Sequence, residues 1–322
     1  MEVIGSGPKA ESIDDLPEEF IMNAISLTTP REACLFSTIS SSFRSAAESD
    51  ALWEKFLPEG YKSTIANSSD PALFNRCASR KELYLHLSDN PLLVDGGHKV
   101  RSVFNFFPSK LNSRHALTQS LSLEKSSGKI CYMLSARDLF IVWGDTPEYW
   151  DWPSEPSTKF NEVAELLCVC WLEIRGRIKA SMLSRQTLYS AYFVFKLTNS
   201  VFGFDYNPVE MSLGPVGGEV VKRRSHLDTR KRRRRHSPFI LRRSREFRTV
   251  TRGVSNGNRE STSPEVQKRE DGWLEVEIGE FFNDDEFGMG EVEMGVLEVD
   301  CNMWKGGLVV NGIQIRPKYV SA

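Results

Sequence analysis

The spacing of apolar residues changes once along the chain, from a helical period to alternation. Within residues 13–58, apolar residues recur three or four positions apart, as on one face of an α-helix. From residue 129 onward they alternate with polar ones, as Val292, Met294 and Val296 do. No helix-length pattern separates the alternating stretches, which disfavours a parallel sheet with crossover helices. The sequence therefore predicts an α+β multidomain protein, with a helical bundle followed by an antiparallel β-sandwich.

Helix-start signals divide the helical segment. Pro17 suits an early helical position, and Thr29-Pro30-Arg31-Glu32 predicts a capping box with Thr29 as N-cap and Glu32 at N3. Asp50 can cap a last short helix that carries Trp53. A bundle of about 45 residues has a small core, and this one is rich in apolar residues, so we expect a partner to cover part of its surface. Packing against the rest of the chain is the alternative.

The run LPEEFIMNAISLTTPREACLFSTISSSFRSAAESDALWEKFLP, residues 16–58, resembles an F-box. The likeness lies in the Leu-Pro opening, the apolar repeat, the Pro30 break, the serine-rich turn and Trp53. It implies a three-helix bundle that docks on a Skp-type adaptor and, through it, on a cullin of a ubiquitin ligase. The positions that match adaptor-binding residues of that family are Leu16, Pro17, Ile21, Ile25, Leu27, Pro30, Leu35 and Ile39.

The stretch WGDTPEYWDW, residues 143–152, holds three of the seven tryptophans of the chain. One interpretation is structural: Trp143 ends a strand and fills the sandwich core, while Asp145-Thr-Pro forms a turn. The other is recognition, with aromatic faces at a loop rim stacking on a sugar ring and nearby carboxylates accepting hydrogen bonds. A second acidic loop, NDDEFGMGE at 283–291, could supply those acceptors.

Six segments between about residues 129 and 318 are similar in order to the phloem lectin family of plants, to which tobacco-agglutinin-type lectins belong. They are SARDLFIVWGDTPEYWDW, EVAELLCVCWLEIRGRI, YSAYFVFKL, DGWLEVEIGEFFN, GEVEMGVLEV and WKGGLVVNGIQIRPK. The resemblance implies a jelly-roll β-sandwich that binds N-acetylglucosamine oligomers and N-glycan cores. It implies a carbohydrate site at Trp143, Trp150, Glu280 and, within the acids at 284–286, Glu286. We expect Trp171 and Trp273 in the core and Trp304 at the core rim; Trp152 and Tyr149 stay open.

An F-box joined to a phloem-lectin domain implies the substrate-recognition subunit of a Skp-cullin-F-box ubiquitin ligase whose target carries a glycan. No catalytic residue and no cofactor are predicted on this chain, and ubiquitin transfer would belong to other subunits. One alternative is a lectin-like or nucleic-acid-binding protein that acts through a basic loop without a ligase role. Another is a glycosidase using Asp284 and Glu286, whose separation the sequence does not fix.

The domain limits follow from these segments. We expect a flexible tail at 1–12, the F-box at 13–58, a helical linker at 59–98 and the sandwich at 121–320. Residues 99–120 have no counterpart in the lectin family and read either as a disordered insertion or as a gene-prediction error. A basic loop at about 222–268 is expected to be disordered.

The basic run sets apart one part of an otherwise acidic chain. Residues 222–248 hold 13 Lys and Arg against Asp228 and Glu246, a net charge of +11, whereas the whole chain is −2. Nuclear import through 230–235 or contact with RNA phosphates are the functional interpretations, and a solvated loop is the plainer one. Phe239 and Phe247 are too sparse for a stacking platform.

The remaining signals concern the compartment. Six cysteines without a CxxC pair, and no histidine at zinc-ligand spacing, predict reduced, buried thiols and no metal site. The N-terminus lacks the basic and apolar regions of a signal peptide, and no apolar run has the length of a membrane span. We therefore expect the cytoplasm, the nucleus or both.

Overall fold

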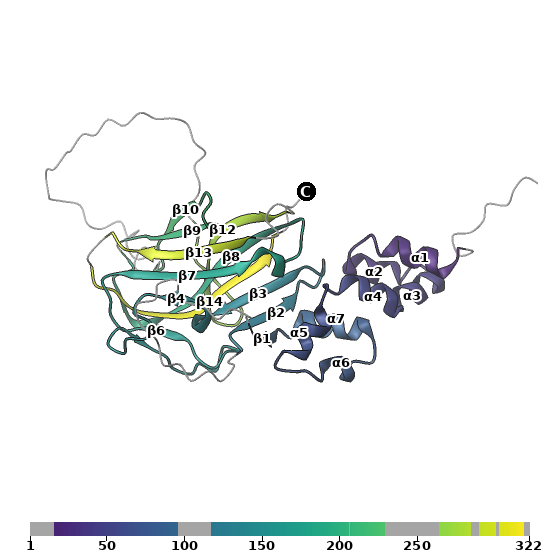
Figure 1. Ribbon diagram of the computed structural model, residues 1–322, viewed down its shortest axis with the longest axis horizontal. Coiled ribbons are helices and arrows are strands. Elements are labelled where there is room, and N and C mark those ends of the chain that lie inside the picture. Colours follow the sequence, from purple (N-terminus) through teal and green to yellow (C-terminus); the bar gives the residue numbers. More distant parts are fainter. Residues whose placement is uncertain are drawn as a thin grey trace, which may run out of the picture.

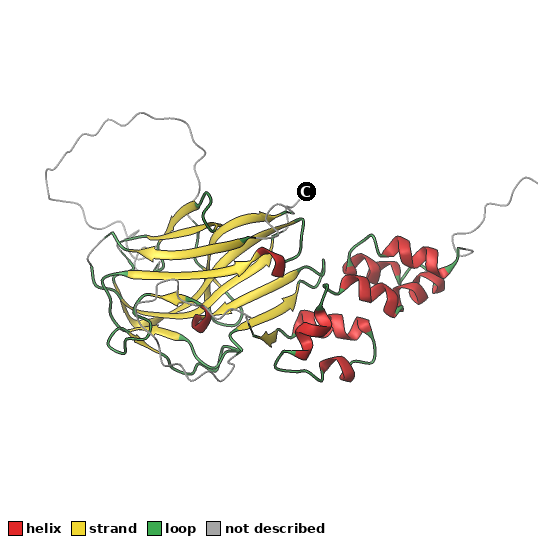
Figure 2. Cartoon of the chain, in the orientation of Figure 1, coloured by secondary structure: helices red, strands yellow, loops and turns green. Residues whose placement is uncertain are grey.

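The computed structural model describes residues 16–95, 117–205, 207–228, 264–284, 290–300 and 303–318. Helices form the N-terminal part, and two antiparallel sheets form the rest (Figures 1 and 2). The predicted fold class, a helical bundle followed by an antiparallel sandwich, is confirmed. The predicted tail at 1–12 lies outside the described residues.

The F-box segment contains four short helices in its described part, where the family resemblance implied three. The Thr29 capping box forms as expected: its hydroxyl accepts from Glu32 N at 3.3 Å, and its own N–H donates to the Glu32 carboxylate at 2.9 Å. Trp53 is buried, and its Nε1 donates to Ala47 O. The helices are α1 (Glu18–Ile25), α2 (Pro30–Phe36), α3 (Ser41–Glu48) and α4 (Asp50–Phe56).

The linker continues the helical part and ends in a strand. Its helices are α5 (Tyr61–Ala66), α6 (Leu73–Arg76) and α7 (Arg80–Asp89). Ser79 caps α7, because its hydroxyl accepts from Glu82 N at 3.1 Å. β1 (Leu92–Val94) then pairs antiparallel with β2, so the sheet begins before the predicted limit at 121.

The described residues form two sheets that pack face to face (Figure 1). The larger runs β1, β2 (Gln119–Leu123), β3 (Ile130–Ser135), β14 (Gly306–Pro317), β8 (Thr187–Phe202), β12 (Leu274–Asn283) and β11 (Gln267–Lys268), with β6 (Ala164–Leu166) on β14 and β5 (Trp150–Asp151) on β6. The smaller runs β10 (Val221–Ser225), β9 (Val209–Pro215), β13 (Glu291–Glu298), β7 (Leu172–Lys179) and β4 (Phe140–Ile141).

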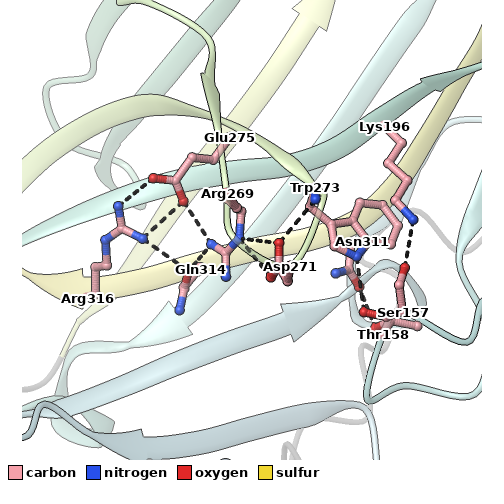
Figure 3. A network of polar contacts seen from close by, with 10 residues as sticks. All are labelled: Ser157, Thr158, Lys196, Arg269, Asp271, Trp273, Glu275, Asn311, Gln314 and Arg316. Carbon is pink, nitrogen blue, oxygen red and sulfur yellow. Dashed lines mark hydrogen bonds and ion pairs between the residues drawn. The ribbon is translucent and has the colours of Figure 1, made fainter.

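The main core lies between the sheets, and a smaller one lies outside. Gly176 on β7 lets the sheets approach closely, because a Cβ there would lie 2.9 Å from Leu139 and 3.2 Å from Ile313. On the outer face of the larger sheet, Trp273 is fully buried, and its Nε1 donates to Ser157 O. Figure 3 shows the polar network around it, in which Glu275 pairs with Arg269 and Arg316. Trp273 is thus a core residue, as predicted.

Three expectations about local structure are wrong in part. β10 and β11 lie inside the segment expected to be a disordered loop, because alternating contacts with β9 and β12 hold them. Residues 119 and 120, assigned to the insertion, begin β2. Among the described cysteines all are free, but only Cys131 is buried and Cys34 is exposed. Residues 96–116 and 229–263 lie outside the description.

The turn between β2 and β3 joins the helical part to the sandwich. Arg31 N donates to Ser126 O at 3.3 Å, and the Tyr84 hydroxyl donates to Lys125 O at 3.0 Å. Lys125 also pairs with Asp89 at 2.9 Å. Within the turn, the Glu124 carboxylate accepts from the following backbone N–H groups. Helices α2 and α7 therefore contact the same turn, and these contacts set the orientation of the bundle relative to the sandwich.

Candidate interaction surfaces

The bundle exposes a set of apolar side chains on α1 and α2, just before α1, and in the turns that follow both helices. Leu27 is 88 % exposed, and Phe20, Leu35 and Ile39 are each about 60 % exposed. Such side chains normally lie in a core, and several together mark a surface that another molecule covers. This bundle face comprises Leu16, Phe20, Leu27, Leu35 and Ile39.

Three of the eight residues predicted to contact an adaptor point the other way. Ile21 and Ile25 are fully buried against the other helices, and Pro30 is buried near Gly128 of the β2–β3 turn. These three residues lie in the interior beneath the bundle face. The prediction that they contact the adaptor directly is therefore wrong. Phe20 was missed, although it follows Leu16 by four residues on the exposed stripe of α1.

The tryptophan-rich loop is held together by its own indoles. Trp150 Nε1 donates to Val142 O at 3.2 Å, and Trp152 Nε1 donates to Gly144 O at 2.9 Å. The guanidinium of Arg137 lies 3.5 Å from the Trp152 ring centroid. Trp143 is 44 % exposed, and its ring lies 5.4 Å from that of Tyr149. Two of the three indoles therefore fasten the loop, and one faces solvent.

The predicted carbohydrate site is not assembled from its four residues. Trp150 is 2 % exposed, because its indole closes the core beneath the loop, so its prediction as a sugar-stacking ring is wrong. Glu280 lies on β12 and pairs with Lys318 at 2.6 Å. Glu286 lies outside the described residues. Only Trp143 remains as an exposed aromatic residue of the predicted set.

Strand pairing shows how far apart Trp143 and Glu280 are. Val142 N donates to Glu173 O at the start of β7, whereas Asn283, three residues after Glu280, donates to Ala180 O just beyond the end of β7. Those two contacts lie seven residues apart on β7, about 23 Å, and Glu280 lies about 10 Å from Asn283 along β12, so Trp143 and Glu280 are separated by at least about 13 Å along the strands. A single sugar ring cannot contact both side chains, so their roles must be separate.

The predictions for the other aromatic residues have different outcomes. Trp171 was expected in the core but is exposed, because its ring turns outward at the start of β7 and its Nε1 donates to Glu173 at 3.1 Å. Trp304 was expected at the core rim and is also exposed. Tyr149 and Trp152 are partly buried and pack against the core.

A charged cavity of about 630 Å³ lies over β8, β12 and β14. Burial alone would raise the pKa of Glu277 there, but hydrogen bonds from Lys318 at 3.0 Å and Arg223 at 2.6 Å outweigh it, and the pKa is lowered. Lys318 likewise gains from Glu280 and Glu277, so its pKa is raised despite desolvation. The acids and bases lining the cavity largely neutralise each other, which suits a structural role.

The described start of the basic run is also neutralised. Lys222 pairs with Glu210 at 2.8 Å, and Arg223 pairs with Glu277 at 2.6 Å. These two cations are therefore engaged within the sandwich. The predicted import signal at 230–235 lies outside the described residues.

Two kinds of feature are absent from the described part of the chain. Within it, no group of three His, Cys, Asp or Glu side chains could hold a metal ion. No helix there is both long and apolar enough to cross a membrane.

Comparison with known proteins places these two parts. The model of the family described as phloem protein 2 matches residues 129–317, and the F-box domain model matches residues 13–55. The chain belongs to the phloem protein 2 family. It is an F-box member of that family, and the F-box implies binding to a Skp-type adaptor. Proteins with an F-box generally serve as adaptor subunits rather than as catalysts.

Relatives share both parts of this phloem protein 2 chain. F-box protein At2g02240 of Arabidopsis thaliana is 43 % identical over 310 residues, covering 96 % of this chain and 82 % of its own length. F-box protein PP2-B1 of the same plant is 38 % identical, covering 96 % and 91 %. F-box protein PP2-B10 is 39 % identical, covering 96 % of both.

Proposed function

We propose that this chain is the substrate receptor of a Skp-cullin-F-box ubiquitin ligase. The observation that carries the proposal is the bundle face, where Leu27, Leu35 and Ile39 project into solvent instead of completing a core. Burying one leucine contributes about 1.5–3 kcal/mol, so a few such side chains can supply much of a stable interface. The adaptor would cover this face, and the sandwich would hold the target.

The proposed mechanism is one of placement. Residues of α2 and α7 donate hydrogen bonds to the β2–β3 turn, so the sandwich keeps one orientation relative to the bundle face. A target bound on the sandwich would then be held at a set distance from the transfer machinery on the partner subunits. No bond is made or broken on this chain in this scheme.

Co-purification with a Skp-type adaptor and a cullin tests the proposal. A Leu27→Asp/Leu35→Asp variant places two charges in the predicted interface, and we expect it to lose the adaptor. A matched control, Val220→Asp/Val221→Asp, changes two exposed valines of the sandwich and should keep the adaptor. If the folded Leu27→Asp/Leu35→Asp variant retains adaptor and cullin at the control's level, the bundle face is not the docking surface.

Saccharide binding is a second, narrower candidate for the sandwich. It is supported by the exposed ring of Trp143, with exposed Asp145 and Glu148 on the same loop. Titration with chitotriose tests it: Trp143→Ala should abolish binding, and Phe282→Ala, which removes a similarly exposed ring at the other end of the sandwich, should not. Equal binding by both variants would remove Trp143 from the site.

A further inference from the structure

A group of exposed apolar side chains lies at the end of the sandwich remote from the helical bundle. At the near end, the Tyr189 hydroxyl donates to Ile130 O beside the β2–β3 turn. Phe202 ends the same strand, β8, about 13 residues and about 40 Å further along. We call the group at this end the distal aromatic surface; it comprises Leu167, Trp171, Phe202, Met303 and Trp304.

These residues belong to segments that are bonded to one another. Val169 and Lys305 exchange two backbone hydrogen bonds, at 2.9 and 2.8 Å, which brings the segment of Trp171 beside that of Trp304. Gly306 pairs with Phe202, and a Cβ on Gly306 would collide with both Leu167 O and the Phe202 ring. The five residues of the distal aromatic surface therefore come from three chain segments that lie side by side.

A buried ion pair holds this surface in shape. Lys305 is fully buried, pairs with buried Glu298, and donates from Nζ to Cys170 O at 2.8 Å. The lysine thus ties the end of β13 to the segment before β7, between Trp304 and Trp171. A surface that is already ordered loses little conformational entropy on binding, which favours binding of a partner.

The charge around the distal aromatic surface is mainly negative. Segments 143–151, 167–171, 198–207 and 299–304 contain no Lys, Arg or His. They contain five acids, of which Asp145, Glu148, Asp151 and Asp300 are exposed, and Asp300 pairs with Arg224 at 3.9 Å. Elsewhere on the sandwich, acids such as Glu275 and Glu293 are matched by arginines. An apolar centre with an acidic rim is complementary to a segment with apolar and basic side chains.

The composition of the surface favours a protein over a small sugar. Small ligands are held in concave pockets lined by a few placed polar groups. The cavities of about 290 and 630 Å³ on the two sheets are lined by other residues. Exposed tryptophans spread over several segments are typical of protein interfaces, where Trp, Tyr and Arg dominate binding.

We propose that the distal aromatic surface docks a basic protein segment that carries apolar side chains. Given the receptor role proposed above, on which this identification rests, the segment belongs to the ubiquitination target. The target would then bind at the end of the sandwich remote from the helical bundle. Target lysines beside the docked segment would lie outside the acidic rim. Trp171 and Trp304 supply the contact area, and Asp145 and Glu148 supply the charge.

Fluorescence anisotropy with a labelled peptide, Lys-Arg-Lys-Phe-Leu-Phe-Arg-Lys, tests the proposal on the full chain. We expect Trp171→Ala/Trp304→Ala to weaken binding at least tenfold, and Phe282→Ala, the matched ring at the opposite end, to leave it unchanged. An Asp145→Asn/Glu148→Gln variant should weaken binding several-fold at low salt and less at high salt. A control peptide with Glu in place of Lys and Arg should not bind.

Equal peptide affinity for Trp171→Ala/Trp304→Ala and Phe282→Ala would overturn the proposal, as would binding of chitotriose but not the peptide at this surface. Tighter peptide binding after deletion of residues 230–263 supports the surface and identifies the chain's own basic run as a competitor. Adaptor co-purification is measured on the same variants and should be unchanged. Loss of peptide binding with an intact adaptor complex therefore concerns this surface and leaves the receptor role standing.

Discussion

Replacing Gly128 tests whether the β2–β3 turn clamps the helical part to the sandwich. Gly128 has φ +73°, and a Cβ there would lie 3.2 Å from Phe56 O, 3.4 Å from the Tyr84 ring and 3.5 Å from Pro30 Cγ. Gly217 has φ +81° in another turn, with nothing within 4 Å of such a Cβ. The pair thus shares its backbone conformation and differs in its surroundings.

The expected difference in the free energy of unfolding is obtained by subtracting the effect of Gly217→Ala from that of Gly128→Ala. Alanine in the left-handed region costs about 1–2 kcal/mol, and the loss of glycine's freedom in the unfolded chain returns about 0.4–1 kcal/mol. Both contributions are common to Gly128→Ala and Gly217→Ala, so they cancel. What remains is overpacking at the junction, about 1–3 kcal/mol. We expect Gly128→Ala to lower the free energy of unfolding by that much more than Gly217→Ala.

Urea denaturation measures this difference, with tryptophan fluorescence as the signal. Trp53 contacts Tyr84, with ring centroids 5.1 Å apart, so its emission reports on the helical side of the junction. Small-angle scattering at low urea reports whether the bundle and sandwich separate before either unfolds. If the two variants unfold within about 0.5 kcal/mol of each other, the turn is not clamped and the placement mechanism loses its basis.

Two further predictions concern stability. Trp150→Ala should lower the free energy of unfolding by about 3–5 kcal/mol because its ring is buried, while Trp143→Ala, whose ring is exposed, should change it by less than about 0.5 kcal/mol; thermal melts that rank them the other way would contradict the loop geometry. Because the folded state lowers the pKa of Glu277, the ionised carboxylate stabilises the protein above its ordinary pKa of 4.5, and this contribution is lost as the pH falls below that value. Glu277→Gln should therefore reduce the loss of stability between about pH 5 and 3. An unchanged dependence of stability on pH would rule out the contribution.

The sequence predicts best where one signal has one structural solution. The Thr29 capping box forms as expected because the spacing of its two side chains leaves little choice of geometry. The alternation of Val292, Met294 and Val296 gives a strand, β13, with all three side chains buried. Both predictions depend on neighbours within a few residues.

Prediction fails where the direction of a side chain depends on distant partners. α1 and the residues just before it carry two apolar stripes, one through Leu16 and Phe20 and one through Ile21 and Ile25. Only packing against the other helices decides which stripe is buried. Trp150 faces inward because Val142 O lies within reach of its indole, which no local pattern reveals. β10 forms from a basic run because Glu210 and Glu277 on neighbouring strands neutralise it.

Hydrogen exchange of the full chain, with and without a Skp-type adaptor, shows where the adaptor docks. We predict slower exchange on adaptor binding in peptides that cover residues 16–39, where the bundle face lies, and unchanged exchange at Trp171 and Trp304. Protection at the distal aromatic surface, or none along residues 16–39 in a complex shown to form, would contradict this prediction.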